Sequence, residues 1–337
     1  MSYNCNNRVL RPTWSAWLPA MLLSAGVLAA GLLPGGPACA AWPERPLKMV
    51  IPFPPGGPTD AVGRQLAQRL SEALGQNVVV ENKAGANSAI GSDAVAKAPA
   101  DGYTLLFNAS IFATNPHLLK LPYDIQRDFT PIGLVAKAPL AIVVAANSPF
   151  KYLNELIEYA RINPGRLNFG IGSNGSAGHL AQEQLKRSAG VDIQMVAYKG
   201  STPAYTDLIG GQIQGFTDPV LGVLPLLPGG RLRLLAVTSK KRLSALPDVP
   251  TVAESGLTEF EFFSWYGLWG PPNLPRELTQ RLNAELNRWL TLPATREQFE
   301  RLGYEGQPGT PEDFARFVRE DSALAARIIR DGNIRAE

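Results

Sequence analysis

Cysteine is nearly absent from this chain of 337 residues. The two cysteines, Cys5 and Cys39, both lie within the first 40 residues. From residue 41 onward the sequence has no thiol, which excludes a disulfide framework and a thiolate metal site there. Histidine is equally scarce: His117 and His179 are the only two, and neither belongs to a His-Glu-x-x-His metal motif. We therefore predict no metal site.

An excess of charge of either sign is also missing. The chain has 32 basic and 29 acidic residues. In residues 1–40 the only charges are Arg8 and Arg11, so without that segment 30 basic residues face 29 acidic ones, a net charge of +1. A nearly neutral chain without basic blocks argues against nucleic acid and against a membrane surface as partners.

Residues 1–40 have the layout of a secretory signal peptide. Basic residues precede an apolar run from Trp14 to Leu33, and the small residues Ala38-Cys39-Ala40 end the segment. A transmembrane anchor is the alternative, because the run approaches the roughly 20 apolar residues that span a bilayer. Pro19 and the small-residue end favour cleavage near Ala40. We predict a soluble, exported protein in the periplasm.

Short β-rich runs alternate with helical periodicity along the rest of the chain, which is typical of α/β units on mostly parallel sheets. Strands are predicted at 47–53, 77–81, 103–107, 139–146, 167–171, 193–198, 212–217 and 232–238. Helices are predicted at 59–74, before Lys97, and at 152–162, 177–188, 203–210, 220–227, 276–290, 295–302 and 311–330. Residues 239–275 are predicted to be irregular.

Three predicted strand-to-helix junctions share one chemistry. They are PPGGPTD (54–60), GIGSNGSAGH (170–179) and KGSTP (199–203). Each places Gly, Ser or Thr beyond a strand and before a helix, where free amides and the helix dipole favour an anion. Pro58 and Pro203 suit the first helical position. These residues could instead only form caps and turns, but three such loops favour convergence on one carboxylate in a cleft.

Thirteen residues at or near strand ends are the candidates for ligand contact: Pro55, Gly56, Gly57, Thr59, Asp60, Ser110, Ser173, Asn174, Gly175, Ser176, Ser201, Asp218 and Trp265. Asp218 has two interpretations. Its carboxylate would face a cationic group, a hydroxyl or an amide of the ligand, or it would cap a helix that starts near Val220.

An enzyme is the competing interpretation. Gly170, Gly172 and Gly175 match the G-x-G-x-x-G fingerprint of dinucleotide sites, but the acid expected at the end of the next strand, near Tyr198, is missing. No G-x-S-x-G nucleophile elbow occurs, and His179, in the first turn of a predicted helix, is interpreted as a hydrogen-bonded structural residue. We predict that the protein has no cofactor and is not an enzyme.

At these loops the sequence resembles the Bug, or TctC-like, solute-binding receptors of tripartite tricarboxylate transport. The matching segments include VIPFPPGGPTD (50–60), NGSAGHLA (174–181), YKGSTPA (198–204) and LPDVPTVAESG (246–256). The resemblance runs from about Trp42 almost to the C-terminus. It implies a Venus-flytrap fold, of the type II-like periplasmic kind, with two α/β lobes that close over a small carboxylate-bearing solute. We assign residues 41–140 and 266–337 to lobe one and residues 141–265 to lobe two.

The resemblance also implies a ligand and partners. The ligand would be a dicarboxylate, an amino acid or an aromatic acid, held by the first two loops largely through backbone amides and water. The partners would be membrane transporter subunits, and we expect a monomer. A sensor role with a membrane signalling partner is the alternative output. The chain departs from the family pattern at Ile171, Ala177 and Gly178, which remove polar groups, and at Pro219, which replaces an asparagine.

Overall fold

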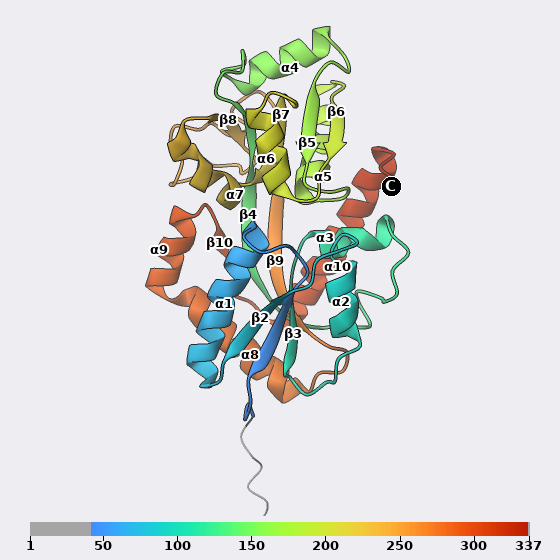
Figure 1. Cartoon of the computed structure of the whole chain (residues 1–337), viewed down its shortest axis with the longest axis vertical. Coiled ribbons are helices and arrows are strands. Elements are labelled where there is room, and N and C mark those ends of the chain that lie inside the picture. The colour runs from blue at the N-terminus through green and yellow to red at the C-terminus, as the bar shows by residue number, and fades with distance from the viewer. Residues whose placement is uncertain (1–41, 336–337) are drawn as a thin grey trace, which may run out of the picture. The chain divides into compact units, whose positions relative to one another are not determined.

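The computed structural model describes residues 42–335 (Figure 1). The predicted signal peptide, residues 1–40, lies outside the described residues. The chain divides into two units, Met1–Trp42 and Pro43–Glu337, and every element below belongs to the second unit. None of the helices in the described range is both long enough and apolar enough to cross a bilayer.

Strands and helices alternate along the second unit, as predicted. The strands are β1 (Leu47–Ile51), β2 (Val78–Asn82), β3 (Thr104–Ala109), β4 (Thr130–Ala145), β5 (Asn168–Ile171), β6 (Gln194–Ala197), β7 (Gly215–Pro219), β8 (Leu232–Val237), β9 (Phe263–Gly270) and β10 (Glu305–Gly306). The α-helices are α1 (Pro58–Leu74), α2 (Ala89–Ala96), α3 (Ile111–Thr114), α4 (Leu153–Ile162), α5 (Ala177–Ala189), α6 (Ser201–Ile209), α7 (Val220–Val223), α8 (Arg276–Thr291), α9 (Pro293–Arg301) and α10 (Pro311–Asp331). Two 3₁₀ helices are η1 (Asn115–His117) and η2 (Leu224–Gly229).

The strands pair in the order β2-β1-β3-β9-β4-β7-β5-β6, and β8 and β10 both pair with β4. Two parallel groups lie at the ends of this order, β2-β1-β3 and β7-β5-β6. The pairs made by β4 and β9 are antiparallel. The α/β prediction is confirmed, but the expectation of mostly parallel pairing is wrong, because these two long strands run against their neighbours.

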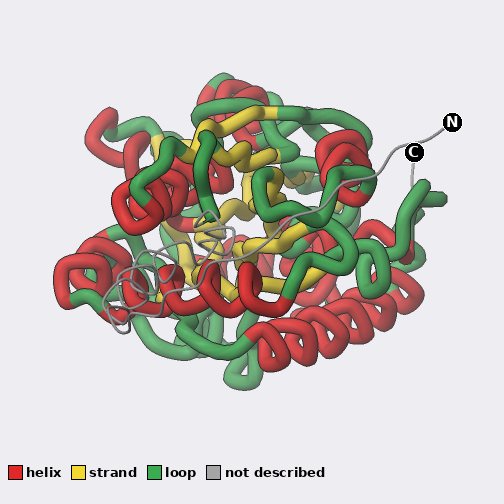
Figure 2. Tube along the Cα trace, turned by 90° about the horizontal axis from the view of Figure 1, so that it is seen from below, coloured by secondary structure: helices red, strands yellow, loops and turns green. Residues whose placement is uncertain are grey.

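Strand β4 links the two groups of strands. Residues 130–139 pair with β9, and residues 140–145 pair with β7 and β8. In Figure 1, β5 to β8 and helices α4 to α7 form the upper group, and β1 to β3 with α1, α2 and α8 form the lower group. Helices surround the strands in the view from below (Figure 2). The carboxyl ends of both parallel groups therefore carry loops that can meet between the groups.

The prediction of irregular structure over 239–275 is wrong where β9 lies. This strand reads FSWYGLWG, and seven of its eight residues are buried. A central strand covered on both faces shows no alternation of polar and apolar residues, so its pattern does not distinguish it from other apolar segments. In β4 the predicted strand over 139–146 covers only the second part of the element. Residues 130–138 were missed because their burial does not alternate with a period of two.

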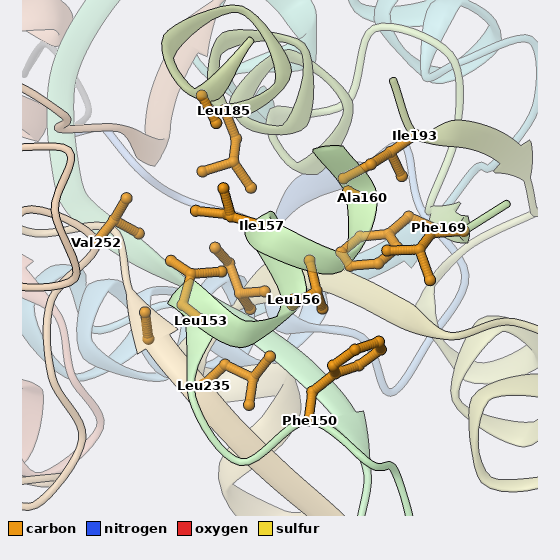
Figure 3. Close-up of a cluster of buried hydrophobic side chains, with 14 of the residues drawn as sticks. Phe150, Leu153, Leu156, Ile157, Ala160, Phe169, Leu185, Ile193, Leu235 and Val252 are labelled. Carbon is orange, nitrogen blue, oxygen red and sulfur yellow. The ribbon is translucent and has the colours of Figure 1, made fainter. Parts of the chain in front are cut away.

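Buried side chains form separate hydrophobic clusters in the two groups. In the upper group Phe150, Leu156 and Phe169 are among those that pack between α4, β5 and α5 (Figure 3). In the lower group Phe112, Trp265, Trp269 and Phe314 pack together, and the rings of Phe112 and Trp269 are 4.7 Å apart. Each fully buried side chain of this size contributes about 1.5–3 kcal/mol, so each group has its own source of stability.

The helix starts follow the local sequence except at Pro203. Thr310 caps α10 in a capping box with Asp313, and Pro311 takes the first helical position, as predicted. Pro58 begins α1. Pro203 is instead the third residue of α6, because Gly200, at φ +106°, turns the chain so that the helix already starts at Ser201. The predicted helix over 220–227 becomes α7 followed by η2, which contains Pro225 and Pro228.

Candidate functional site

The first candidate loop, residues 54–60, is held by Asp60. The Asp60 carboxylate accepts hydrogen bonds from the Gly56 amide at 2.9 Å, from Arg64 Nε at 2.9 Å and from Asn82 Nδ2 at 2.8 Å. Burial opposes its negative charge, but the three donors outweigh burial and lower the pKa of Asp60. The Gly56 amide is therefore engaged by Asp60. The amides of the first turn of α1, such as that of Thr59, have no acceptor within the helix and are candidates to bind an anion.

Loop two, residues 172–176, is organised by His179. The Gly175 amide donates to Nδ1 of His179 at 3.1 Å, and Ser176 Oγ caps α5 by accepting the His179 amide at 3.3 Å. Burial, and then the charge of Lys186, lower the pKa of His179 to about 4, so the ring is neutral and can accept at Nδ1 at neutral pH. This agrees with the structural role predicted for His179. The Ser176 amide donates to the Ser173 carbonyl at 3.1 Å.

Loop three, residues 199–203, links loop two to Asp218. The Gly200 amide donates to the Gly172 carbonyl at 2.8 Å, so loops two and three are linked through their backbones. Ser201 Oγ donates to Oδ1 of Asp218 at 2.8 Å, and the hydroxyl of Tyr205 donates to Oδ2 at 3.0 Å. Strands β6, β5 and β7 are neighbours and end at these segments, which explains why the segments meet.

Asp218 does not cap the following helix. The residue before α7 is Pro219, and no side chain caps that helix start. The carboxyl group of Asp218 instead points to the hydroxyls of Ser201 and Tyr205 and is 5% exposed. Burial raises the pKa of Asp218 to about 7, although the two hydroxyl donors oppose this rise. The cap interpretation of Asp218 is therefore wrong, because its acceptors are already used by side chains of α6.

Contacts across the two groups of strands bring loop one to Asp218. A Cβ built on Gly222 would overlap Oδ2 of Asp218 and would lie 3.3 Å from Cγ of Pro58. Pro58 begins α1, so the start of α1 lies beside Asp218 and Gly222. On the other side, the side chain of Asn87 donates to the Asn174 carbonyl at 3.1 Å. We call the region between these two contacts the seam.

Ser110 and Trp265 are placed differently from one another. Ser110 follows β3; its Oγ is 3.4 Å from Ser264 Oγ, and its amide donates to the Trp265 carbonyl at 2.9 Å. The Trp265 side chain is 1% exposed and packs against Trp269, Phe314 and Phe317. It is part of the lower core, so we correct the prediction and leave Trp265 out of the candidate site. Side chains of successive residues in a strand point to opposite faces. The side chains of Ser264 and Tyr266 therefore point to the face of the sheet opposite that of Trp265.

Three tyrosines belong to this region and were missed in the sequence. Tyr205 binds Asp218, and the ring of Tyr266 lies 5.8 Å from that of Tyr304 and 6.1 Å from that of Phe107. Burial, and the charge of Asp218 as a smaller effect, raise the pKa of both Tyr266 and Tyr304. Burial, and then the charge of Asp218, also raise the pKa of Tyr205, so all three tyrosines are neutral hydroxyls at neutral pH. The sequence carries no signal that could have found them, because a buried tyrosine near a site cannot be told from any other aromatic residue of the core.

Two other features lie apart from the loops. Within residues 42–335, no three His, Cys, Asp or Glu side chains are grouped so that they could hold a metal ion. An open groove of about 500 Å³ lies where α4, α5 and α10 meet, and its lining includes Glu183, Lys186, Arg187 and Asp331. These charges pair with one another, Lys186 with Glu183 and Arg187 with Asp331, both at 3.0 Å. Arg161 also lines the groove and pairs with Glu158. Each basic side chain of the lining is therefore already in an ion pair, and we prefer the seam as the anion site.

A family model described as the tripartite tricarboxylate transporter family receptor, TctC, matches residues 62–334. The chain belongs to this family. The family consists of binding receptors, so the chain is a receptor and not an enzyme, as predicted. The resemblance to the Bug and TctC-like receptors is confirmed.

Relatives of this receptor support the same fold. A UPF0065 protein in the tcbD-tcbE intergenic region of Pseudomonas sp. (strain P51) is 39% identical over 298 residues, which cover 88% of this chain and 89% of the relative. The solved structure of R. palustris Rpa4515 with adipate has a TM-score of 0.84 and 35% identity, and the match covers 88% of this chain and 100% of that one. The periplasmic binding protein BugD has a TM-score of 0.80 and 36% identity, with the same two coverages. The predicted two-lobed α/β fold is confirmed by these neighbours.

Proposed function

We propose that this receptor captures a small carboxylate-bearing solute in the periplasm and delivers it to a tripartite tricarboxylate-type membrane transporter. One observation carries the proposal: loops one, two and three and Asp218 meet at one seam although they come from two separate groups of strands. Open parallel sheets bind ligands beyond the carboxyl ends of their strands. A relative of the same fold holds the dicarboxylate adipate.

The ligand carboxylate would be bound by the amides at the start of α1 and in loop two. The first-turn amides of Thr59 and Asp60 have no acceptor within their helix, and the positive end of the α1 dipole favours an anion. Pro55, Gly56 and Gly57 shape loop one, and Gly56 has φ +84°, which favours glycine. Ser173, Asn174, Gly175 and Ser176 would complete the grip from the opposite lobe, with Ser110 and Ser201 at its edges.

The two lobes would be residues 41–140 with 266–337, and residues 141–265. Strand β4 crosses between the groups of strands near residue 140, and β9 leads back at residues 263–270. Two crossing segments suit a hinge that opens and closes the seam around the ligand. The receptor would work as a monomer.

A thermal-shift panel tests the ligand class. Residues 41–337 would be heated with adipate, malate, aspartate and benzoate, and each acid would be matched by its neutral amide. A ligand at 100 times its Kd adds about 2.7 kcal/mol, which raises Tm by several degrees. We expect a rise with at least one acid and none with its amide. Equal rises with acids and amides, or no rise with any acid, would reject a carboxylate grip.

A further inference from the structure

The loop between β2 and α2 has an unusual backbone. Gly85, Ala86, Asn87 and Ser88 have φ values of +134°, +45°, +51° and +73°. Left-handed backbone is costly for residues with a Cβ, and asparagine tolerates it better than alanine or serine. Three such residues in a row persist only where surrounding contacts hold them, and strain of this kind is concentrated at functional positions.

Buried side chains of the lower group hold this turn. Nδ2 of Asn115 donates to the Asn87 carbonyl at 2.6 Å and lies 3.4 Å from Ser88 Oγ. Ser92 Oγ donates to the Ser88 carbonyl at 2.9 Å and accepts from Asn108 Nδ2 at 3.0 Å. Asn115, Ser92 and Asn108 are fully buried. The backbone of the turn is thus anchored in the core, and it presents the Asn87 side chain from a fixed position.

The side chain of Asn87 reaches from this anchored turn to the opposite group of strands. Its Nδ2 donates to the Asn174 carbonyl, in loop two, at 3.1 Å. The next residue, Gly175, has φ +75°, and a Cβ there would overlap Leu118 and press on Thr114 at 3.0 Å. The Gly175 amide is bound to His179. Both ends of the Asn87–Asn174 bond are therefore rigid, and it forms only when loop two lies against the lower group.

We propose that Asn87 is a positioning residue that latches loop two in the closed arrangement and so raises ligand affinity without touching the ligand. The preset turn lets the bond form with little further ordering, which is the advantage of a preorganised contact. The inference rests on the proposed opening and closing of the lobes. The latch joins protein atoms only, however, so its test needs no ligand.

Pulsed electron resonance between two spin labels measures the opening directly. Residues 41–337 have no native cysteine. Spin labels can therefore be placed at two introduced cysteines alone, Gln68→Cys on α1 and Thr206→Cys on α6, and both positions are exposed. We expect Asn87→Ala and Asn87→Gly to move the ligand-free distances toward longer values. Glycine relaxes the left-handed turn while it removes the amide, so that variant folds even if the alanine variant does not. Unchanged distances in the folded variants would overturn the proposal.

Asn273 offers a matched control. It is also a left-handed asparagine, at φ +58°, and it lies in an exposed loop after β9. Asn273→Ala should leave the label distances unchanged. An equal lengthening in this control would mean general loosening and would overturn the latch. The thermal-shift panel separates the two proposals: longer distances in the Asn87 variants support the latch even if no acid binds, and acid binding with unchanged distances rejects the latch alone.

Discussion

Ser201 donates its hydroxyl to Oδ1 of Asp218 at 2.8 Å, although Ser201 begins α6 and Asp218 lies in β7, 17 positions later. Tyr205, one turn further along α6, donates to the other carboxyl oxygen. The carboxyl group is buried, and burial raises its pKa to about 7. Asp218 therefore changes its charge near neutral pH, beside the first residue of α1.

The first prediction concerns stability and pH. The pKa of Asp218 in the folded chain, about 7, lies above its ordinary value of 3.8. Between these values the folded state binds more protons than the unfolded state, so stability falls as pH rises from about 4 to about 7. Asp218→Asn removes this slope. Urea unfolding at several pH values measures this. The free energy of unfolding of the variant, relative to that of the wild type, should rise as pH rises from about 4 to about 7.

His179 contributes the opposite slope, because its lowered pKa of about 4 makes stability fall as pH drops below 6.5. Both proteins contain His179, so its effect cancels in the difference between them. A difference that stays constant from pH 4 to pH 8 would contradict the pKa assigned to Asp218.

The second prediction concerns what Asp218 recognises. A carboxylate beside the seam suits a ligand ammonium group better than a second carboxylate. We expect Asp218→Asn to weaken the binding of aspartate at least tenfold and the binding of succinate much less. The reason is that a charge-assisted hydrogen bond contributes about 1.5–3 kcal/mol. Calorimetric titration of both acids measures this contrast. Small and equal changes in the affinity for both acids would mean that Asp218 only binds Ser201 and Tyr205 and does not recognise the ligand.

The third prediction concerns the support of loop one. Asp60→Ala leaves the Gly56 amide without its acceptor and removes one of the two acceptors of Asn82 Nδ2. We expect a loss of about 1–3 kcal/mol together with weaker carboxylate binding. Asp93 is the control, because it pairs with Lys97 four residues later on α2, as Asp60 pairs with Arg64 on α1. Asp93→Ala should cost less than about 1 kcal/mol. If both changes have equal effects on the free energy of unfolding and on ligand affinity, the Asp60–Arg64 pair is an ordinary surface ion pair.

The fourth prediction concerns Gly178. A Cβ at this position would overlap the Thr217 carbonyl, so only glycine lets the first turn of α5 lie against β7. Gly178→Ala should cost about 1–3 kcal/mol or more through overpacking. Gly309→Ala is the control, since its nearest neighbours are 3.9 Å from the added atom. Chemical unfolding that ranks the two variants equally would argue against this close approach.

The fifth prediction concerns export. The full chain, expressed in a Gram-negative host, should reach the periplasm and start near Ala41, because the first 40 residues follow the order of a cleaved leader. Cell fractionation and intact mass give the answer. A protein that keeps residues 1–40 and stays in the membrane fraction would point to an anchor.

Central strands were the main feature that sequence reasoning missed. Helices α1, α8 and α10 follow from apolar residues at helical spacing, because one face of each is buried and the other meets water. Strand β9 is buried on both faces, so no period separates it from its surroundings. The antiparallel pairing of β4 and β9 depends on which strands become neighbours, which is a property of the whole sheet.

Three features could be predicted from the amino-acid sequence: the alternation of strands and helices, the glycine-rich loops at strand ends and the lack of thiols after residue 40. Each depends on residues that are neighbours in the chain, so local chemistry was sufficient. Three other features became visible only in the folded chain: Asn87 meets Asn174, 87 positions later, Pro58 lies beside Gly222, and Trp265 belongs to the core. Such contacts exist because sheet pairing and core packing bring distant segments together, and burial then fixes the partners that each polar group can reach.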